Sequence, residues 1–180
     1  MKRLQKILVP TDLSEGSRRA LRYACALATE EDASIVILHV ANEFKAWEMY
    51  SDDFAICNSY RPWPLDRILS EATLDLNTFL EADLDILRTV PRITKRVLLG
   101  QVADQIVYSA EDEGADLIVM APRREQTFRL LFSTSVTNKV MRMSPCPVLC
   151  IAPPRSRQPE RGELVRSTFA GLRPKLVHEP

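Results

Sequence analysis

The chain has 180 residues, 46% of them hydrophobic, and its 24 basic side chains balance its 24 acidic ones. This length and apolar content suit one domain with a real core, and a net charge of zero gives no sign of a nucleic-acid or anionic membrane partner. No apolar run approaches the roughly 20 residues of a membrane-spanning helix, and the start lacks the apolar stretch of a secretory signal, so we expect a cytoplasmic protein.

Short apolar runs alternate with helical patterns along the chain. The runs cover residues 7–9, 35–38, 97–99, 117–120 and 148–151. Because they are apolar at every position, we expect buried strands that helices cover on both sides. The alternation predicts an α/β fold, namely a doubly wound, open sheet of five parallel strands with helices on both faces.

The helical patterns lie over residues 14–28, 65–87, 102–114 and 133–141. Ser14 is a candidate N-cap for the first helix. Apolar spacing from Leu65 to Leu87 indicates one long second helix that begins just after Pro64. We expect Gly114 to be the C′ residue of the third helix, because glycine readily adopts the left-handed conformation that closes a helix.

Two segments fall outside this alternation. Residues 42–63 are rich in aromatic side chains and form an insertion that is either a packed lid or contact surface, or a loop that covers the sheet edge. Residues 153–180 form a tail rich in Arg and Pro, which we expect to be partly disordered. The predicted organisation is therefore one domain over residues 1–152, followed by this tail.

Ligands of open parallel sheets bind beyond the carboxyl ends of the strands, where the strand order reverses. Two turns are expected at that edge: the first holds Pro10, Thr11 and Asp12, and the second spans residues 121–135. The Asp12 carboxylate could accept hydrogen bonds from a ribose or a base edge, since Ser14 already supplies the helix cap. It could equally bond its own backbone as a turn aspartate. The sequence leaves both interpretations open.

The second turn contains no glycine from Ala121 to Arg129. A phosphate cradle needs glycines, because backbone amides must approach the phosphate oxygens closely. The chain also lacks the G-x-x-x-x-G-K-[ST] and G-x-G-x-x-G motifs, which excludes the common P-loop and dinucleotide sites. Arg123 and Arg124, with the cluster at 133–135, favour either a weak anion site or two solvated arginines beside an ordinary helix cap.

The cysteines and histidines of the sequence give little indication of a disulfide, a metal site or an acid–base catalyst. Four cysteines occur in the chain, namely Cys25, Cys57, Cys146 and Cys150. They form no C-x-x-C pair, so we expect reduced thiols. The only two histidines, His39 and His178, lie far apart, which argues against zinc. His39 ends a buried strand, and we expect a hydrogen-bonded core residue there rather than a catalytic base.

Five segments together resemble the universal stress protein family. They are residues 6–12 (KILVPTD), 37–40 (ILHV), 99–100 (LG), 113–120 (EGADLIVM) and 144–149 (SPCPVL). The resemblance covers about residues 4–152. It implies a five-stranded sheet of the adenine nucleotide alpha hydrolase-like type. It also implies a homodimer in which the last strand, from Pro147 to Ala152, pairs with its twin.

The family's ATP-binding members carry the motif G-x-x-G-x9-G-[ST] around the phosphates. On this chain its three glycines fall at Ala121, Arg124 and Thr134, and only Ser135 keeps its residue type. The adenine side retains Asp12 and the backbone of Val40. The candidate ligand-binding residues are therefore Pro10, Thr11, Asp12, Val40, Ala121, Arg123, Arg124, Thr134, Ser135 and Val136.

The resemblance thus implies membership of the family without ATP binding of the usual kind. We expect a non-enzymatic, dimeric stress-response or signalling module with no cofactor and no metal, and with protein partners rather than a membrane or nucleic acid. The alternative is a regulatory switch that binds ATP or AMP through a modified loop, with Arg124 supplying charge in place of backbone amides.

Overall fold

The computed structural model of the chain describes residues 3–41, 65–122 and 136–152. The predicted aromatic insertion at 42–63 and the predicted tail at 153–180 lie outside these residues.

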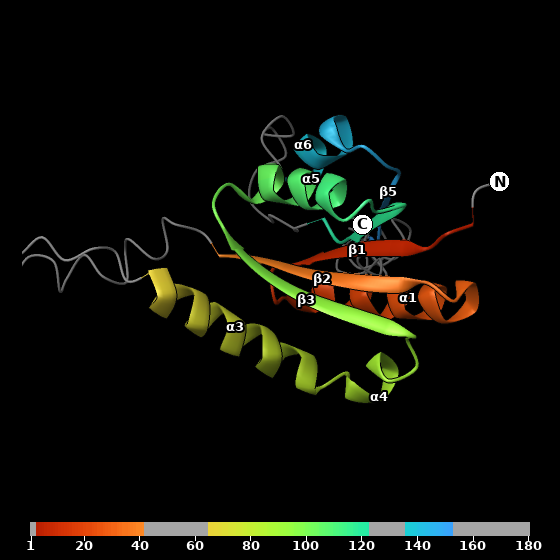
Figure 1. Ribbon diagram of the computed structural model, residues 1–180, viewed down its shortest axis with the longest axis horizontal. Coiled ribbons are helices and arrows are strands. Elements are labelled where there is room, and N and C mark those ends of the chain that lie inside the picture. The colour runs from red at the N-terminus through yellow and green to blue at the C-terminus, as the bar shows by residue number, and fades with distance from the viewer. Residues whose placement is uncertain (1–2, 42–64, 123–135, 153–180) are drawn as a thin grey trace, which may run out of the picture.

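A single parallel sheet forms the centre of the described structure (Figure 1). Its strands are β1 (Lys6–Thr11), β2 (Ser34–Ala41), β3 (Arg92–Leu99), β4 (Leu117–Met120) and β5 (Val148–Cys150). They are ordered β3-β2-β1-β4-β5, and every neighbouring pair is parallel. The predicted fold class is confirmed, because a parallel sheet that grows in both directions from β1 is doubly wound.

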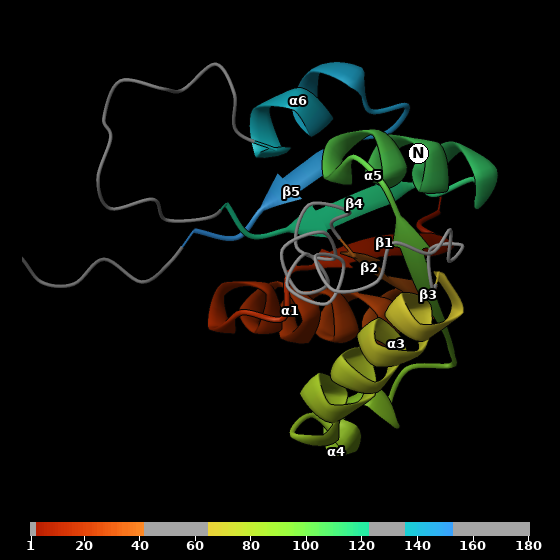
Figure 2. The same cartoon turned by 90° about the vertical axis from the view of Figure 1, so that its left-hand side faces the viewer.

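Helices cover both faces of the sheet. They are α1 (Glu15–Glu31), α3 (Leu65–Glu81), α4 (Leu84–Leu87), α5 (Val102–Asp112) and α6 (Val136–Met143). Helices α1, α3 and α4 lie on one side, and α5 and α6 lie on the other (Figure 2). Alternate residues of one strand serve the two faces, since Ile7 and Val9 pack with the α1 side and Leu8 packs with the α5 side. This explains why the strand sequences are apolar at every position.

Local signals in the sequence place several helix ends correctly. The Ser14 side chain accepts a hydrogen bond from the Ser17 backbone N–H, as an N-cap does. Gly114 has a φ of 59°, which is the left-handed conformation expected beyond the end of α5. Asp32 takes the same role after α1, with a φ of 55°.

The prediction of one long helix from Leu65 to Leu87 is wrong. Helix α3 ends at Glu81, and the single turn of α4 begins at Leu84. Asp83 lies between them and is only 4% exposed. The chain breaks here because the Asp83 carboxylate turns inward to two arginines of α1, a partnership that apolar spacing does not reveal.

The third strand also differs from its prediction. Strand β3 begins at Arg92, five residues before the apolar run, and Arg92, Thr94 and Lys95 are exposed. β3 is an edge strand, so part of it faces solvent instead of lying beneath helices on both sides. Charged residues on such an edge discourage pairing with other chains.

Candidate functional site

The strand order reverses between β1 and β4, and this switch point is where open α/β sheets bind ligands. Ala121 directly follows β4, and Gly16 lies in the first turn of α1. A methyl group added at Gly16 would lie 3.5 Å from the Ala121 Cβ and 3.4 Å from the Ser14 Oγ. The start of α1 therefore lies close against the end of β4, and the Ala121 methyl group occupies part of the space between them.

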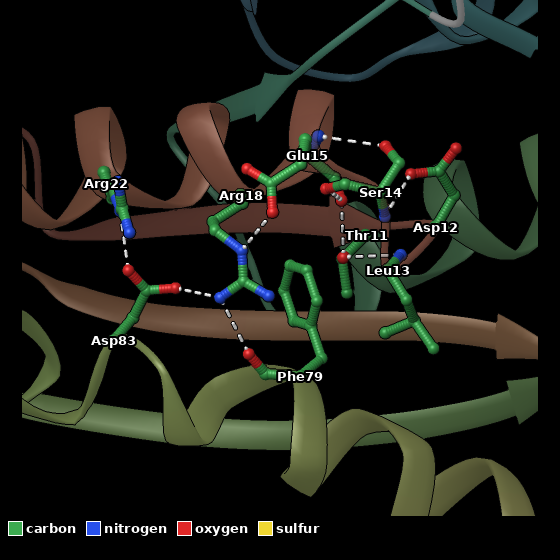
Figure 3. A network of polar contacts seen from close by, with 10 residues as sticks. Thr11, Asp12, Leu13, Ser14, Glu15, Arg18, Arg22, Phe79 and Asp83 are labelled. Carbon is green, nitrogen blue, oxygen red and sulfur yellow. Dashed lines mark hydrogen bonds and ion pairs between the residues drawn. The ribbon is translucent and has the colours of Figure 1, made fainter.

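The turn after β1 satisfies its own polar groups (Figure 3). The Leu13 N–H donates to the Thr11 Oγ1 at 3.0 Å, and the Ser14 N–H donates to the Asp12 Oδ1 at 3.1 Å. The Thr11 and Ser17 hydroxyls lie 2.9 Å apart. Asp12 thus makes the backbone contact of a turn aspartate, although its side chain remains exposed at the sheet edge.

Leu13 adopts a strained backbone at the centre of this turn. Its φ is 62°, a left-handed conformation that side-chain-bearing residues rarely adopt. Such a conformation persists only where the surroundings fix it. The hydrogen bonds from Leu13 and Ser14 to the preceding side chains supply that restraint, so the edge of the switch point has a well-defined shape.

The end of β2 lies beside the turn that follows β1, at the same edge of the sheet. Val40 is 9% exposed, and its side chain packs into the apolar cluster beneath α5. The neighbouring His39 ring donates from Nδ1 to the Thr11 backbone carbonyl at 3.0 Å. The predicted hydrogen bond of His39 is present, although this residue is half-buried rather than part of the core. The contact joins the ends of β1 and β2.

The structure brings together only part of the predicted site. The first turn, Val40 and Ala121 all lie at the carboxyl edge of the sheet, and Val136 opens α6 with 39% of its surface exposed. Arg123, Arg124, Thr134 and Ser135 lie outside the described residues. The phosphate half of the candidate site is therefore still a prediction from sequence.

An ionic cluster around the buried Asp83 lies beside the start of α1 and was not predicted from the sequence (Figure 3). The Asp83 carboxylate accepts from Arg18 Nη1 at 2.5 Å and from Arg22 Nε at 2.6 Å. Arg18 also donates to the Phe79 carbonyl, pairs with Glu15 and lies 4.2 Å from the Phe79 ring centre. These contacts fasten the start of α1, and with it the candidate site, to the end of α3. The only sequence signal is that Arg18 and Arg22 lie one helical turn apart.

The described cysteines are free thiols with suppressed acidity. Cys25 is fully buried, and loss of solvation together with the Asp83 charge raises its pKa to about 11. Burial also raises the pKa of the Cys146 and Cys150 thiols. Thiols in such surroundings are poor nucleophiles, because the thiolate is the reactive form.

The described residues show neither a metal-binding cluster nor a membrane-spanning helix. No group of three or more His, Cys, Asp or Glu side chains there is arranged to hold a metal ion. None of the helices in the same residues combines the length and apolar character needed to cross a membrane.

The universal stress protein family model matches residues 3–152. The chain belongs to the universal stress protein family. A family member from Thermus aquaticus is 31% identical over 145 residues, which cover 81% of this chain and 96% of that protein. A second, from Methanocaldococcus jannaschii, is 27% identical over 155 residues, which cover 82% and 94% of the two proteins.

Solved structures of the family share the fold. That of the Methanocaldococcus jannaschii protein has a TM-score of 0.64 at 25% identity, covering 86% of this chain and 100% of its own. A universal stress protein solved in complex with cAMP has a TM-score of 0.55 at 23% identity, covering 84% of this chain and 98% of its own. The resemblance inferred from five short segments is thus confirmed for the family and for the fold.

Proposed function

We propose that this universal stress protein is a non-enzymatic, cytoplasmic module that works as a homodimer through contacts with other proteins and does not hold ATP in the usual way. The observation that carries this proposal is the loss of all three motif glycines, at Ala121, Arg124 and Thr134. Triphosphate oxygens need exposed backbone amides beneath them, and side chains at these positions keep the oxygens away.

The described half of the switch point supports this proposal. The Ala121 methyl group lies where glycine would leave open space, close to the first turn of α1. The Leu13 and Ser14 amides of the β1 turn are already bonded to neighbouring side chains. A ligand entering here would have to displace protein contacts as well as water, which lowers affinity.

The first test asks which small molecules the full-length protein carries and binds. We expect native mass spectrometry to find no stoichiometric ATP after purification without added nucleotide, and calorimetry to detect no saturable ATP binding. The matched variant replaces all three motif positions, as Ala121→Gly/Arg124→Gly/Thr134→Gly. A gain of ATP affinity in this variant would show that side chains block the cradle, whereas ATP bound by the unaltered protein would refute the proposal.

Dimerisation is proposed through β5, which is the edge of the described sheet next to β4. The Ile151 N–H bonds to the Met120 carbonyl, and the Pro147 carbonyl accepts from Ile118. Because backbone groups alternate in direction along a parallel strand, those of Val148 and Cys150 face the open edge. A second copy of the strand could pair with these groups.

This register gives a sharp test of the dimer. Val148→Pro removes an outward-facing N–H and leaves the bonds to β4 intact, while Val148→Thr keeps the N–H and serves as the control. We expect light scattering after size exclusion to show a dimer for the unaltered chain and the control, and a monomer for the proline variant. A proline variant that stays dimeric would exclude pairing through β5.

A second candidate function is a nucleotide-dependent switch. It is favoured by the related universal stress protein solved with cAMP and by the retention of Asp12 at the edge of the switch point. Binding of cAMP or AMP with loss of affinity in both Asp12→Ala and Arg124→Ala would support it. Affinities that neither substitution changes would reject a nucleotide site of this design.

A further inference from the structure

Two sulfur atoms lie close together on the face of the sheet that α5 and α6 cover, between α6 and the edge strand β5. The Cys150 Sγ is 4.0 Å from the Met141 Sδ. Met141 is 49% exposed on α6, and Cys150 is half-buried at the end of β5. The thiol and the thioether therefore meet at a place that solvent can reach.

A third sulfur-bearing residue stands beside this pair. Met120, the last residue of β4, is the register partner of Cys150 in the parallel pairing of β4 with β5. Paired residues of neighbouring strands point to the same face of a sheet. Met120 belongs to the apolar cluster beneath α5 and α6, and Cys150 packs against that cluster. Met120 is only 5% exposed, so it is the most buried of the three sulfur-bearing residues.

We propose that Met120, Met141 and Cys150 form a binding site for Cu(I). Thiolate and thioether sulfurs are the soft donors that select this ion over the harder divalent metals. Three sulfurs about 2.3 Å from one metal and spread evenly around it lie about 4.0 Å from one another. The distance between the Cys150 and Met141 sulfurs already matches that spacing.

Binding at this site releases one proton. Cu(I) replaces the hydrogen of the Cys150 thiol, so a sulfur–metal bond forms, the S–H bond breaks, and the proton goes to the buffer with no change in oxidation state. Because a thiolate rather than a thiol binds the metal, affinity at the site increases as the pH rises.

The same region of the chain supplies two matched controls. Cys146 is a second half-buried thiol packed against the same apolar cluster, but its neighbour is the Ser144 hydroxyl at 3.8 Å. Met143 is a second exposed methionine of α6, at 50% exposure. Neither takes part in the sulfur group, so Cys146→Ser and Met143→Leu test whether any thiol or any surface thioether is enough.

The experiment titrates the full-length, reduced protein anaerobically against Cu(I) held by a coloured chelator such as bicinchoninate. We expect one tightly held Cu(I) per chain. Cys150→Ser and Met141→Leu should each weaken binding by about 100-fold or more, since changes outside the ligand shell alone cost about 10- to 100-fold. Cys146→Ser and Met143→Leu should leave the affinity unchanged. X-ray absorption of the loaded protein should show three sulfur neighbours at about 2.3 Å.

Clear outcomes would overturn the proposal. Equal losses in Cys146→Ser and Cys150→Ser would mean general thiol binding only, and an unchanged affinity in Met141→Leu would exclude the thioether as a ligand. Met141→Leu alters an exposed side chain of similar size, so an unchanged melting temperature of the metal-free variant shows that its fold is intact. Nucleotide binding and dimerisation each have their own test, so failure of Cu(I) binding can be told apart from failure of the proposed function.

Discussion

The ion pairs on the two faces of the sheet differ in how deeply their charges are buried. On the side of α1 and α3, the buried Asp83 carboxylate joins two arginines of α1 and interrupts the helix that follows the aromatic segment. On the side of α5 and α6, an apolar cluster is accompanied by ion pairs that are partly exposed: Arg96 of β3 pairs with Asp112 and Glu113 at the end of α5, and Lys139 of α6 pairs with Asp104 of α5. A buried charge fixes one arrangement of helices, because losing a partner is costly, whereas apolar packing tolerates adjustment.

The largest expected effect is at Asp83. Asp83→Ala should lower the free energy of unfolding by about 3–5 kcal/mol, because it leaves Arg18 partly buried without its main counter-charge. The control is Glu15→Gln, which removes the exposed partner of Arg18 and should cost less than about 1 kcal/mol. Urea denaturation measures both. Equal effects of the two changes would mean that the α1 side is not fixed by its buried charge.

The next largest effect is a loss of stability at high pH, caused by Cys25 of α1 on the face that also holds Asp83. The pKa of the Cys25 thiol is raised by burial, and further by Asp83, from 9.0 to about 11. The folded state therefore holds this proton more tightly than the unfolded state, and its stabilisation is complete below about pH 9 and is lost as the pH rises to about 11. The loss should reach about 3 kcal/mol, at roughly 1.4 kcal/mol per pH unit.

Cys25→Ala isolates this contribution. Any other group that contributes in this range is present in both proteins, so the quantity of interest is the difference between the two curves of unfolding free energy against pH. A constant difference from pH 8 to 11 would show that Cys25 does not titrate as described.

Two buried serines, one on each face of the sheet, differ in whether their hydroxyl groups are hydrogen-bonded. Ser17 on α1 is 3% exposed and bonds to Thr11 and to the Ser14 carbonyl, while the Oγ of Ser109 on α5 is buried with no hydrogen-bond partner among the described residues. Ser17→Ala should cost about 1–2 kcal/mol, and Ser109→Ala should be neutral or stabilise by about 1 kcal/mol. Thermal unfolding of the two variants measures the contrast, and a clear loss of stability in Ser109→Ala would contradict it.

The smallest effect is expected at the surface pair of the α5 side. Lys139→Ala should change the free energy of unfolding by less than about 1 kcal/mol, because the pair with Asp104 is exposed and screened by salt. Repeating the urea titration in 1 M salt should abolish the difference from the unaltered chain. A larger, salt-resistant loss would show that the Lys139–Asp104 pair is not an ordinary exposed ion pair.

The sequence predicted the parts of the fold that depend on neighbours in the chain. Apolar runs located all five strands, and Ser14 and Gly114 correctly marked the ends of two helices. The break at Asp83 could not be predicted, because its partners Arg18 and Arg22 lie more than 60 residues earlier in the chain. The exposed start of β3 was missed because only the strand order makes it an edge.

In the candidate site too, the features that depend on neighbours in the chain were predictable, and those that depend on tertiary contacts were not. Its position at the end of β1 follows from the alternation of strands and helices, and the structure places Asp12 and Ala121 at that edge. The hydrogen bond from the Ser14 amide to Asp12 was one of two readings that the sequence allowed. The proximity of Cys150 to Met141 was not foreseen, since it depends on how α6 lies over β5.

The central position of β1 has a consequence for synthesis on the ribosome. Leu8 pairs with Val36 of β2 on one side and with Ile118 of β4 on the other. One edge of β1 therefore stays unpaired until β4 has been synthesised, roughly 110 residues later. At about 5–20 residues per second, that delay lasts about 5–20 s. During this time the nascent chain carries a strand with an open, apolar edge, which makes it a candidate for chaperone binding before the sheet can close around β1.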